Sequence, residues 1–336
     1  MFKGEFYTEV TKQETRKTKM NTNVKFAADN MMNNLSAGRC SLSLLFSNDA
    51  VNTATVFMAE NKPVDVEKLR ECNALIKRKF SAFSGLRLDF YDFVAAKAAL
   101  SSNPETYLDN LAFAYKSFTN KFGRFSSLSV LPAAHLATLR DFTSDKCNMV
   151  VDRAWEIYRL IKANHRIVAD YNDIFYCYIL ATQTKPIERI VEECEIYYSY
   201  AKRWLSNDSA LRLAEILTVF GRNPEESVNK MRTLIKQLGM AHGWHENRIL
   251  VTALAAMYDV EASEIKEVSD YLFRQKNFGG GKINSSNRLM LASALVILDR
   301  TEDYSVKAFV ENGIVYSLYK EKEDEESTYV ATASWM

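Results

Sequence analysis

Arginine recurs at the start of apolar segments along this chain. A small polar residue is followed three positions later by arginine and then by mostly apolar residues, as in Ser209-Ala210-Leu211-Arg212 before LAEILTVF. The arginines at this position are Arg39, Arg87, Arg212, Arg248 and Arg288. A guanidinium group can hold a carboxylate or phosphate through two parallel hydrogen bonds. The chemistry that these residues offer is therefore the binding of anions.

Helix stability does not explain the arginines. If the small polar residue is an N-cap, the residue three positions on is one where Glu or Gln usually completes a capping box. A cation there opposes the helix dipole and costs a few tenths of a kcal/mol. Ser129 and Asp173 take the arginine position in two copies, so a continuous ladder of arginines is not expected.

Two interpretations of the arginines follow. In the first, helix N-termini lie along one edge and present guanidinium groups to an anionic ligand or to an acidic segment of a partner. In the second, each arginine ties one repeat to the next by pairing with a carboxylate or carbonyl group, because a buried charge must be paired. The second interpretation is the simpler one, and the five arginines remain the candidate binding residues.

The spacing of the copies predicts helical hairpins. Their first residues lie 36 to 48 positions apart, the range of two-helix repeats. These residues are Ser36, Ser84, Ser126, Asp170, Ser209, His245 and Ser285. The segments that follow them are apolar on all sides and predict inner helices, whereas the segments between, such as 187–201, are amphipathic and predict outer helices. We predict an all-α, two-layer array of about seven helical hairpins, either an open α/α solenoid or a closed α/α toroid.

Composition limits the classes of partner. The 336 residues are 47% hydrophobic and 25% charged with a formal net charge of +1, so no charge excess favours nucleic acid or an anionic membrane. We expect residues 1–22 to be a polar lead-in, residues 23–320 to be a single helical-repeat domain, and residues 321–336 to be an acidic and then apolar tail. The final amphipathic helix is expected to end near Lys320.

Neither a metal nor a cofactor is expected. His242 and His245 lie three positions apart beside Glu246, but no third ligand is evident. The five cysteines are widely spaced and predict reduced, mostly buried thiols. The N-terminus lacks the apolar core of a signal peptide, and no apolar run approaches the ~20 residues that span a bilayer, so we expect a cytoplasmic protein.

A group of tyrosines is the second candidate surface. Tyr176, Tyr178, Tyr197 and Tyr198 could line a groove for a peptide, because aromatic side chains combine a large contact area with a polar tip. At helical spacing such residues more often pack between helices.

Residues 79–139, with sequence KFSAFSGLRLDFYDFVAAKAAL…SVLPAAHLATL, resemble a bacterial family catalogued as domain of unknown function 4003. The resemblance continues to about residue 300. It implies a bacterial cytoplasmic protein, and it carries over no active site.

The leading hypothesis for function is a non-catalytic binding or scaffold module that recognises a protein segment or an anionic ligand. The alternative is an α/α-toroid enzyme in which the arginines clamp an anion and Asp89, Asp92 or Glu215 acts as general base. The chain contains no P-loop, no dinucleotide fingerprint and no nucleophile elbow.

Overall fold

The computed structural model describes most of the chain. The described residues are 20–41, 47–81, 84, 86, 91–123, 127–139, 142–239, 248–275 and 283–333. Within them only the backbone is described at 38–41, 47–49, 127–128, 171 and 322–333. The described residues form helices and no strand, which confirms the all-α prediction.

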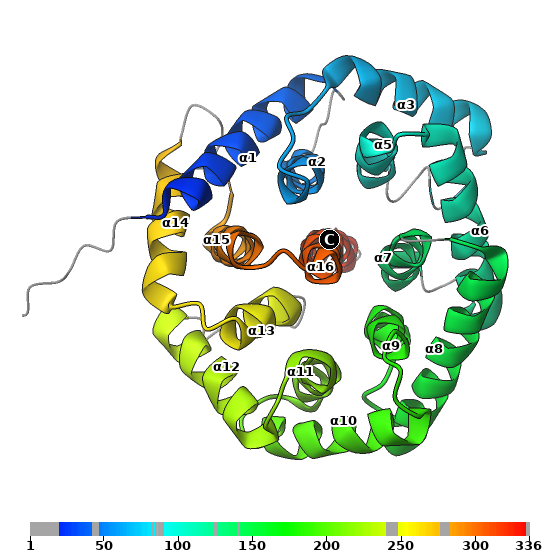
Figure 1. The fold of residues 1–336 in the computed structure, drawn as a ribbon, viewed down its shortest axis with the longest axis vertical. Helices are drawn as coiled ribbons and strands as arrows, with labels where there is room; N and C mark the ends of the chain where they lie inside the picture. Colours follow the sequence, from blue (N-terminus) through cyan, green and yellow to red (C-terminus); the bar gives the residue numbers. More distant parts are fainter. Residues whose placement is uncertain are drawn as a thin grey trace, which may run out of the picture.

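The helices alternate between an outer and an inner layer (Figure 1). The outer helices are α1 (Thr22–Ser41), α3 (Val66–Lys79), α6 (Pro104–Phe122), α8 (Ser144–Asn164), α10 (Ile187–Ala201), α12 (Pro224–Leu238) and α14 (Ala262–Arg274). The inner helices are α2 (Ser47–Ala59), α5 (Tyr91–Leu100), α7 (Ser127–Thr138), α9 (Ile174–Ala181, after the 3-10 turn Tyr171–Asp173), α11 (Asn207–Phe220), α13 (Ile249–Met257) and α15 (Ser285–Arg300). Two layers of hairpins are therefore present, as predicted.

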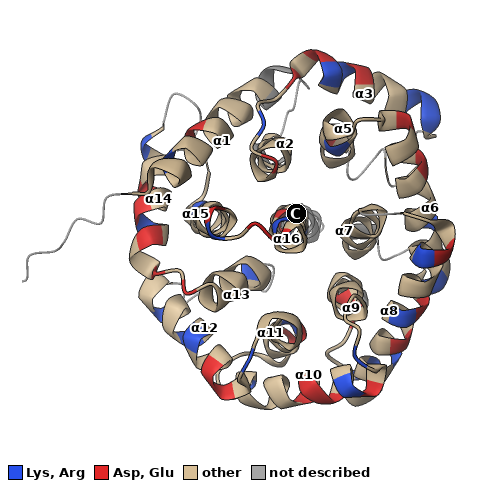
Figure 2. Cartoon of the chain, in the orientation of Figure 1, with Lys and Arg blue, Asp and Glu red and all other residues tan. Residues whose placement is uncertain are grey.

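Local sequence separates the two layers. The outer helices α6 and α12 each begin with an asparagine N-cap followed by proline, Asn103-Pro104 and Asn223-Pro224, and each keeps one exposed face. The inner helix α13 is buried over Ile249–Ala256 because neighbours cover it on all sides. Apolar segments thus form the inner layer, and amphipathic segments, on which many charged residues gather, form the outer layer (Figure 2).

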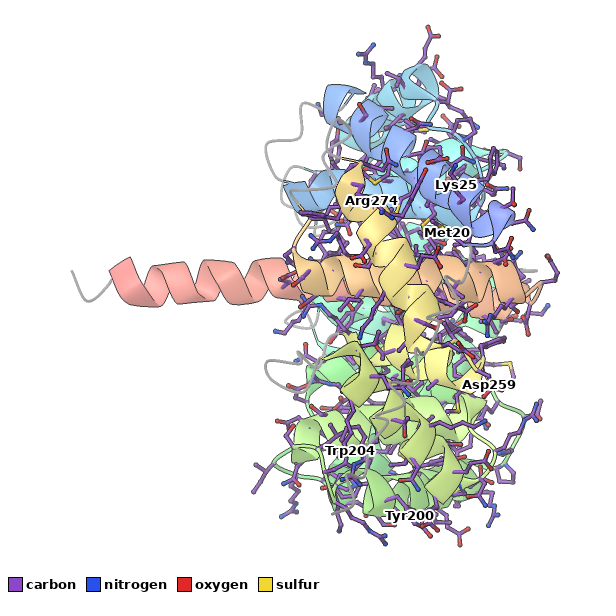
Figure 3. All side chains as sticks on the ribbon, turned by 90° about the vertical axis from the view of Figure 1, so that its left-hand side faces the viewer. Met20, Lys25, Tyr200, Trp204, Asp259 and Arg274 are labelled. Carbon is purple, nitrogen blue, oxygen red and sulfur yellow. The ribbon has the colours of Figure 1, made fainter. Side chains whose placement is uncertain are left out.

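The first and last hairpins lie side by side, so the helices form a ring (Figure 1). Helix α1 packs against α14 and α15. The Met20 backbone N–H donates to Glu267 at 2.9 Å, and the Asn21 amide donates to Asp299 at 2.8 Å. Figure 3 views this seam, with Met20 labelled beside α14.

The first copy of the repeat differs from the prediction. Ser36 does not begin an inner helix, because α1 runs without a break from Thr22 to Ser41. The buried series Val24, Ala28, Met31 and Leu35 holds α1 against the core at helical spacing up to this point. The first inner helix is instead α2, and each hairpin runs from an outer helix to an inner one.

Neighbouring inner helices run in the same direction, as contacts between their first turns show. The Ser129 hydroxyl of α7 donates to the Asn172 carbonyl at 2.9 Å and accepts from the Phe175 N–H of α9 at 2.8 Å. Arg248 at the start of α13 donates to Asn287 in the first turn of α15. The N-termini of the inner helices therefore share one face of the ring, and their C-termini share the other.

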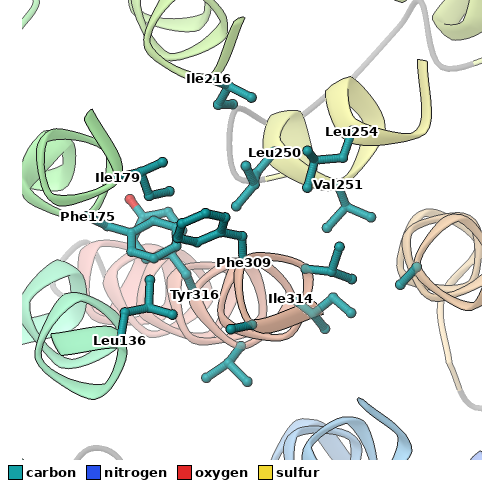
Figure 4. Packing of buried hydrophobic residues seen from close by; sticks show 14 of the residues in the cluster. Leu136, Phe175, Ile179, Ile216, Leu250, Val251, Leu254, Phe309, Ile314 and Tyr316 are labelled. Carbon is teal, nitrogen blue, oxygen red and sulfur yellow. The ribbon is translucent and has the colours of Figure 1, made fainter. Parts of the chain in front are cut away.

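A further helix, α16 (Tyr304–Ala333), passes through the centre of the ring (Figure 1). Its residues 308–319 are buried, and Phe309, Ile314 and Tyr316 pack against inner-helix residues such as Leu250 (Figure 4). A short turn follows α15, so α16 returns in the opposite direction. The helix was expected to end near Lys320, but it continues to Ala333 and projects from the ring (Figure 3). Strong helix formers such as Glu and Lys after residue 320 favour this continuation.

No helix in the described ranges combines the length and apolar character needed to cross a membrane.

Gly313 lies where α16 packs closely against α13. A Cβ atom built at this position would lie 2.5 Å from Leu250 Cδ2 and 3.1 Å from Leu250 Cγ. We predict that Gly313→Val lowers the free energy of unfolding by about 1–3 kcal/mol, because overpacking outweighs the gain in helix propensity. Urea denaturation would measure the loss.

Leu250→Ala provides the control for this prediction. The single change removes buried methyl groups and should cost about 2–5 kcal/mol. Because the cavity that it leaves accepts the new valine, the double variant should be more stable than the sum of the two losses implies. Simple additivity would show that Gly313 is not constrained by Leu250.

Candidate functional site

Two of the candidate arginines lie at the starts of inner helices, and a third lies in the second turn of one. Arg212 belongs to α11, Arg248 precedes α13 and Arg288 belongs to α15. Arg39 differs, since it lies near the C-terminal end of the outer helix α1, and its side chain is not described. Arg87 lies outside the described residues.

Arg248 forms a carboxylate-binding site with two asparagines of the next hairpin, and Glu321 of α16 occupies it. The Arg248 Nη2 and Asn284 Nδ2 atoms donate to Glu321 Oε1 at 3.1 and 3.0 Å. The Asn287 Nδ2 atom donates to Glu321 Oε2 at 2.7 Å, and Asn287 Oδ1 accepts from Arg248 Nε and Nη2. We call Arg248, Asn284 and Asn287 the carboxylate clamp.

The clamp is held by buried structure. Arg248 is 3% exposed and Asn287 4% exposed, and the Asn284 side chain caps α15 by accepting from the Asn287 N–H at 2.8 Å. Burial lowers the pKa of Arg248, and the negative charge of Glu321 opposes that change. One guanidinium donor, Arg248 Nη1, is buried without a hydrogen-bond partner.

Arg288 directly follows Asn287 of the clamp and contacts residues of its own hairpin. It donates to the Ile283 carbonyl, and its guanidinium group lies 4.7 Å from the centre of the Phe273 ring. This is a cation–π contact. The Nε atom of Arg288 is buried without a hydrogen-bond partner.

Arg212 lies in a different charged group. It is 5% exposed, with Nε 3.6 Å from Asp173 Oδ1 and Nη2 3.8 Å from Asp170 Oδ1. Both aspartates lie at the start of α9, the inner helix of the hairpin that precedes the hairpin of Arg212. Arg212 and Arg248 therefore contact different neighbours and do not form one site.

Two buried carboxyl groups accompany Arg212. Burial raises the pKa of Asp173 to about 7, although Arg212 acts in the opposite direction. Burial also raises the pKa of Glu215 well above its usual value, with a further increase from Asp173. Glu215 is 1% exposed and neither of its oxygens has a hydrogen-bond partner, which fits a protonated, neutral side chain.

A second buried charged group lies where α16 faces α5. The Lys97 ammonium of α5 lies 3.0 Å from Glu311 of α16 and 3.7 Å from Glu60. The Tyr319 hydroxyl donates to Asp92 at the start of α5. The sequence analysis missed Lys97 and Glu311, whose only signal is a charge within an otherwise apolar helical run.

Three carboxylates were considered as a general base, namely Asp89, Asp92 and Glu215. Asp89 lies outside the described residues. Asp92 is bonded to Tyr319, and Glu215 is sealed in the interior. Both described carboxylates are buried in this arrangement.

The four candidate tyrosines do not line a common groove. Tyr176 is 1% exposed and meets Tyr316 of α16 with ring centres 6.1 Å apart. Tyr178 lines a cavity at the C-terminal end of α9. Tyr197 is buried on the outer helix α10, and Tyr198 packs against His165 with ring centres 4.4 Å apart.

The described residues contain no group of three or more His, Cys, Asp or Glu side chains placed to hold a metal ion. His242 and His245 lie outside the described residues. Four cysteines are free and buried, namely Cys72, Cys147, Cys177 and Cys194.

The buried carboxyl groups predict a pH dependence of stability. Below about pH 4, Glu215 is protonated in both the folded and unfolded chain. As the pH rises, the unfolded chain loses the proton first, so the free energy of unfolding falls. Glu215→Gln should flatten this fall as the pH rises above about 5 in urea titrations, because glutamine does not titrate.

Glu225→Gln is the matched control. Glu225 is exposed in the first turn of α12, so its removal should leave the slope of stability against pH unchanged. Equal slopes for wild type and Glu215→Gln would show that Glu215 ionises as readily when folded as when unfolded.

Comparison with known proteins gives one match. Residues 44–322 match the family described as "Protein of unknown function (DUF4003)". No curated protein and no solved structure matches the chain. The matched region includes the described hairpins from α2 to α15, the carboxylate clamp and the buried part of α16. The chain belongs to the DUF4003 family.

Proposed function

We propose that this protein is a non-catalytic binding module that recognises an acidic segment of a partner protein at the inner-helix N-terminal face, beside the carboxylate clamp. The observation that carries the proposal is the position of Glu321. Three side-chain donors from two inner hairpins converge on this carboxylate at the point where α16 leaves the ring. The face is therefore shaped for carboxylate recognition.

Charge supports a further anion on this face. Arg248 and Arg288 contribute two positive charges near the starts of α13 and α15, whereas Glu321 contributes one negative charge. Each helix N-terminus adds about half a positive charge. These positive charges favour a carboxylate beside the clamp.

The filled centre of the ring favours binding over catalysis. Tyr316 and Ile314 of α16 occupy the axis, where an open toroid would hold a substrate. The charged groups that flank α16 are paired or sealed, including Lys97 and Glu215. A partner would therefore meet the described part of the ring from outside, as at the face where the inner helices begin.

The proposal predicts that a fluorescent hexaglutamate peptide binds at low ionic strength and that binding weakens with added salt. Arg248→Gln should weaken binding about tenfold or more, since a hydrogen bond to a charged group contributes about 1.5–3 kcal/mol. Glu321→Gln should strengthen binding, because it removes the carboxylate that competes for the clamp. Fluorescence anisotropy would give the dissociation constants.

Arg232→Gln is the control, because Arg232 is an exposed arginine of the outer helix α12. It should bind the peptide like wild type, and a hexaglutamine peptide should bind none of the variants. Circular dichroism would establish that each variant is folded. Equal affinity of wild type and Arg248→Gln for hexaglutamate would overturn the proposal.

A further inference from the structure

A cavity of about 430 Å³ lies on the opposite face of the ring, where the inner helices end. The last turns of α7, α9 and α11 form three of its sides, and the first turns of α16 form the fourth. Its lining residues are Leu136, Leu139, Tyr178, Thr182, Val219, Phe220, Asp303, Tyr304, Ser305, Val306, Ala308 and Phe309. This volume lies within the range of small-molecule sites, roughly 300–1,000 Å³.

Aromatic rings form much of the wall and are held at fixed angles. Phe220 of α11 meets Phe309 of α16 edge to face, with ring centres 5.6 Å apart and an interplanar angle of 76°. Tyr178 packs against Phe118 with ring centres 6.0 Å apart. Tyr304 stands at the mouth and is 38% exposed. Such rings offer electron-rich faces that attract a cation.

The charged group that lines the cavity is a carboxylate. Among the lining residues that the structure describes, Asp303 is acidic and none is Lys, Arg or His. Three inner helices direct their C-terminal ends, each with about half a negative charge, toward this face. The N-terminus of α16 opposes them, but Asp303 caps it by accepting from the Ser305 N–H at 2.8 Å. The full negative charge of Asp303 exceeds the half positive charge of the α16 N-terminus.

We propose that this cavity binds a small organic cation, an ammonium compound with an apolar body. The aromatic and aliphatic walls suit the apolar body, and Asp303 with the helix C-termini suits the positive charge. An anion would meet no cationic side chain among the lining residues in the described part of the chain. This site is separate from the carboxylate clamp, and it does not depend on the proposed recognition of an acidic segment.

The test compares probes of one shape and different charge. Choline, its neutral isostere 3,3-dimethylbutan-1-ol and the anion 3,3-dimethylbutyrate would be titrated into the full chain, with binding followed by ligand-observed NMR. Choline should bind at least tenfold more tightly than the neutral isostere, because only the cation gains from Asp303 and the ring faces. The anion should bind most weakly of the three.

Two variants locate the binding site. Asp303→Asn retains a residue able to cap α16 but removes the charge, and Tyr304→Ala removes an aromatic wall at the mouth. Each variant should weaken choline binding about threefold or more. In Asp303→Asn, the affinity for 3,3-dimethylbutan-1-ol should fall by a smaller factor than the affinity for choline. Glu302→Gln is the matched control, since Glu302 lies next in sequence, pairs with Lys307 and does not line the cavity.

Several outcomes would overturn the proposal. Equal affinity for choline and its neutral isostere would make the cavity a plain apolar site. No binding of choline at about 10 mM would rule out the cation, and equal loss in Asp303→Asn and Glu302→Gln would place the effect outside the cavity. The melting temperature of each variant would establish that the fold is retained.

Discussion

The structure depends on filling the axis of the ring with one helix. The inner helices expose apolar side chains toward the centre, and a gap there would leave them without packing partners. Helix α16 provides the missing surface over residues 308–319. The ring and its central helix therefore stabilise each other. Gly313 shows how closely the two surfaces meet.

The polar residues of the interior follow from this constraint. A helix that passes through the centre places its polar side chains among inner helices, where each charge must find a partner. Glu311 meets Lys97, Tyr319 meets Asp92, and Glu321 meets Arg248. The repeated arginines belong partly to this pattern, because Arg212 pairs with the preceding hairpin and Arg248 with the following one. Glu215 instead has no hydrogen-bond partner, and burial raises its pKa well above the usual value.

Much of the architecture could be predicted from the sequence, because local features encode it. Apolar and amphipathic segments alternate at hairpin spacing, and Asn-Pro pairs begin outer helices such as α6. The position of α16 could not be predicted, because its sequence also suits an eighth hairpin. The partner of Arg248 is 73 positions away in sequence, so no local pattern links Arg248 to Glu321. The start at Ser36 was wrong because a polar residue near the end of α1 imitates an N-cap.

The parallel arrangement of the inner helices gives the ring two chemically different faces. Since each hairpin repeats the same order of outer and inner helix, the inner-helix dipoles add, whereas alternating directions would cancel them. One face gathers helix N-termini together with Arg248 and Arg288, and the other gathers C-termini with Asp303 and aromatic rings. The dipole of helix α16 points opposite to the dipoles of the inner helices. Helix α16 also places one carboxylate at each face of the ring, Glu321 where the inner helices begin and Asp303 where they end. Glu321 at the first face accepts hydrogen bonds from three side chains, whereas Asp303 at the second accepts from the Ser305 backbone N–H and lines the cavity.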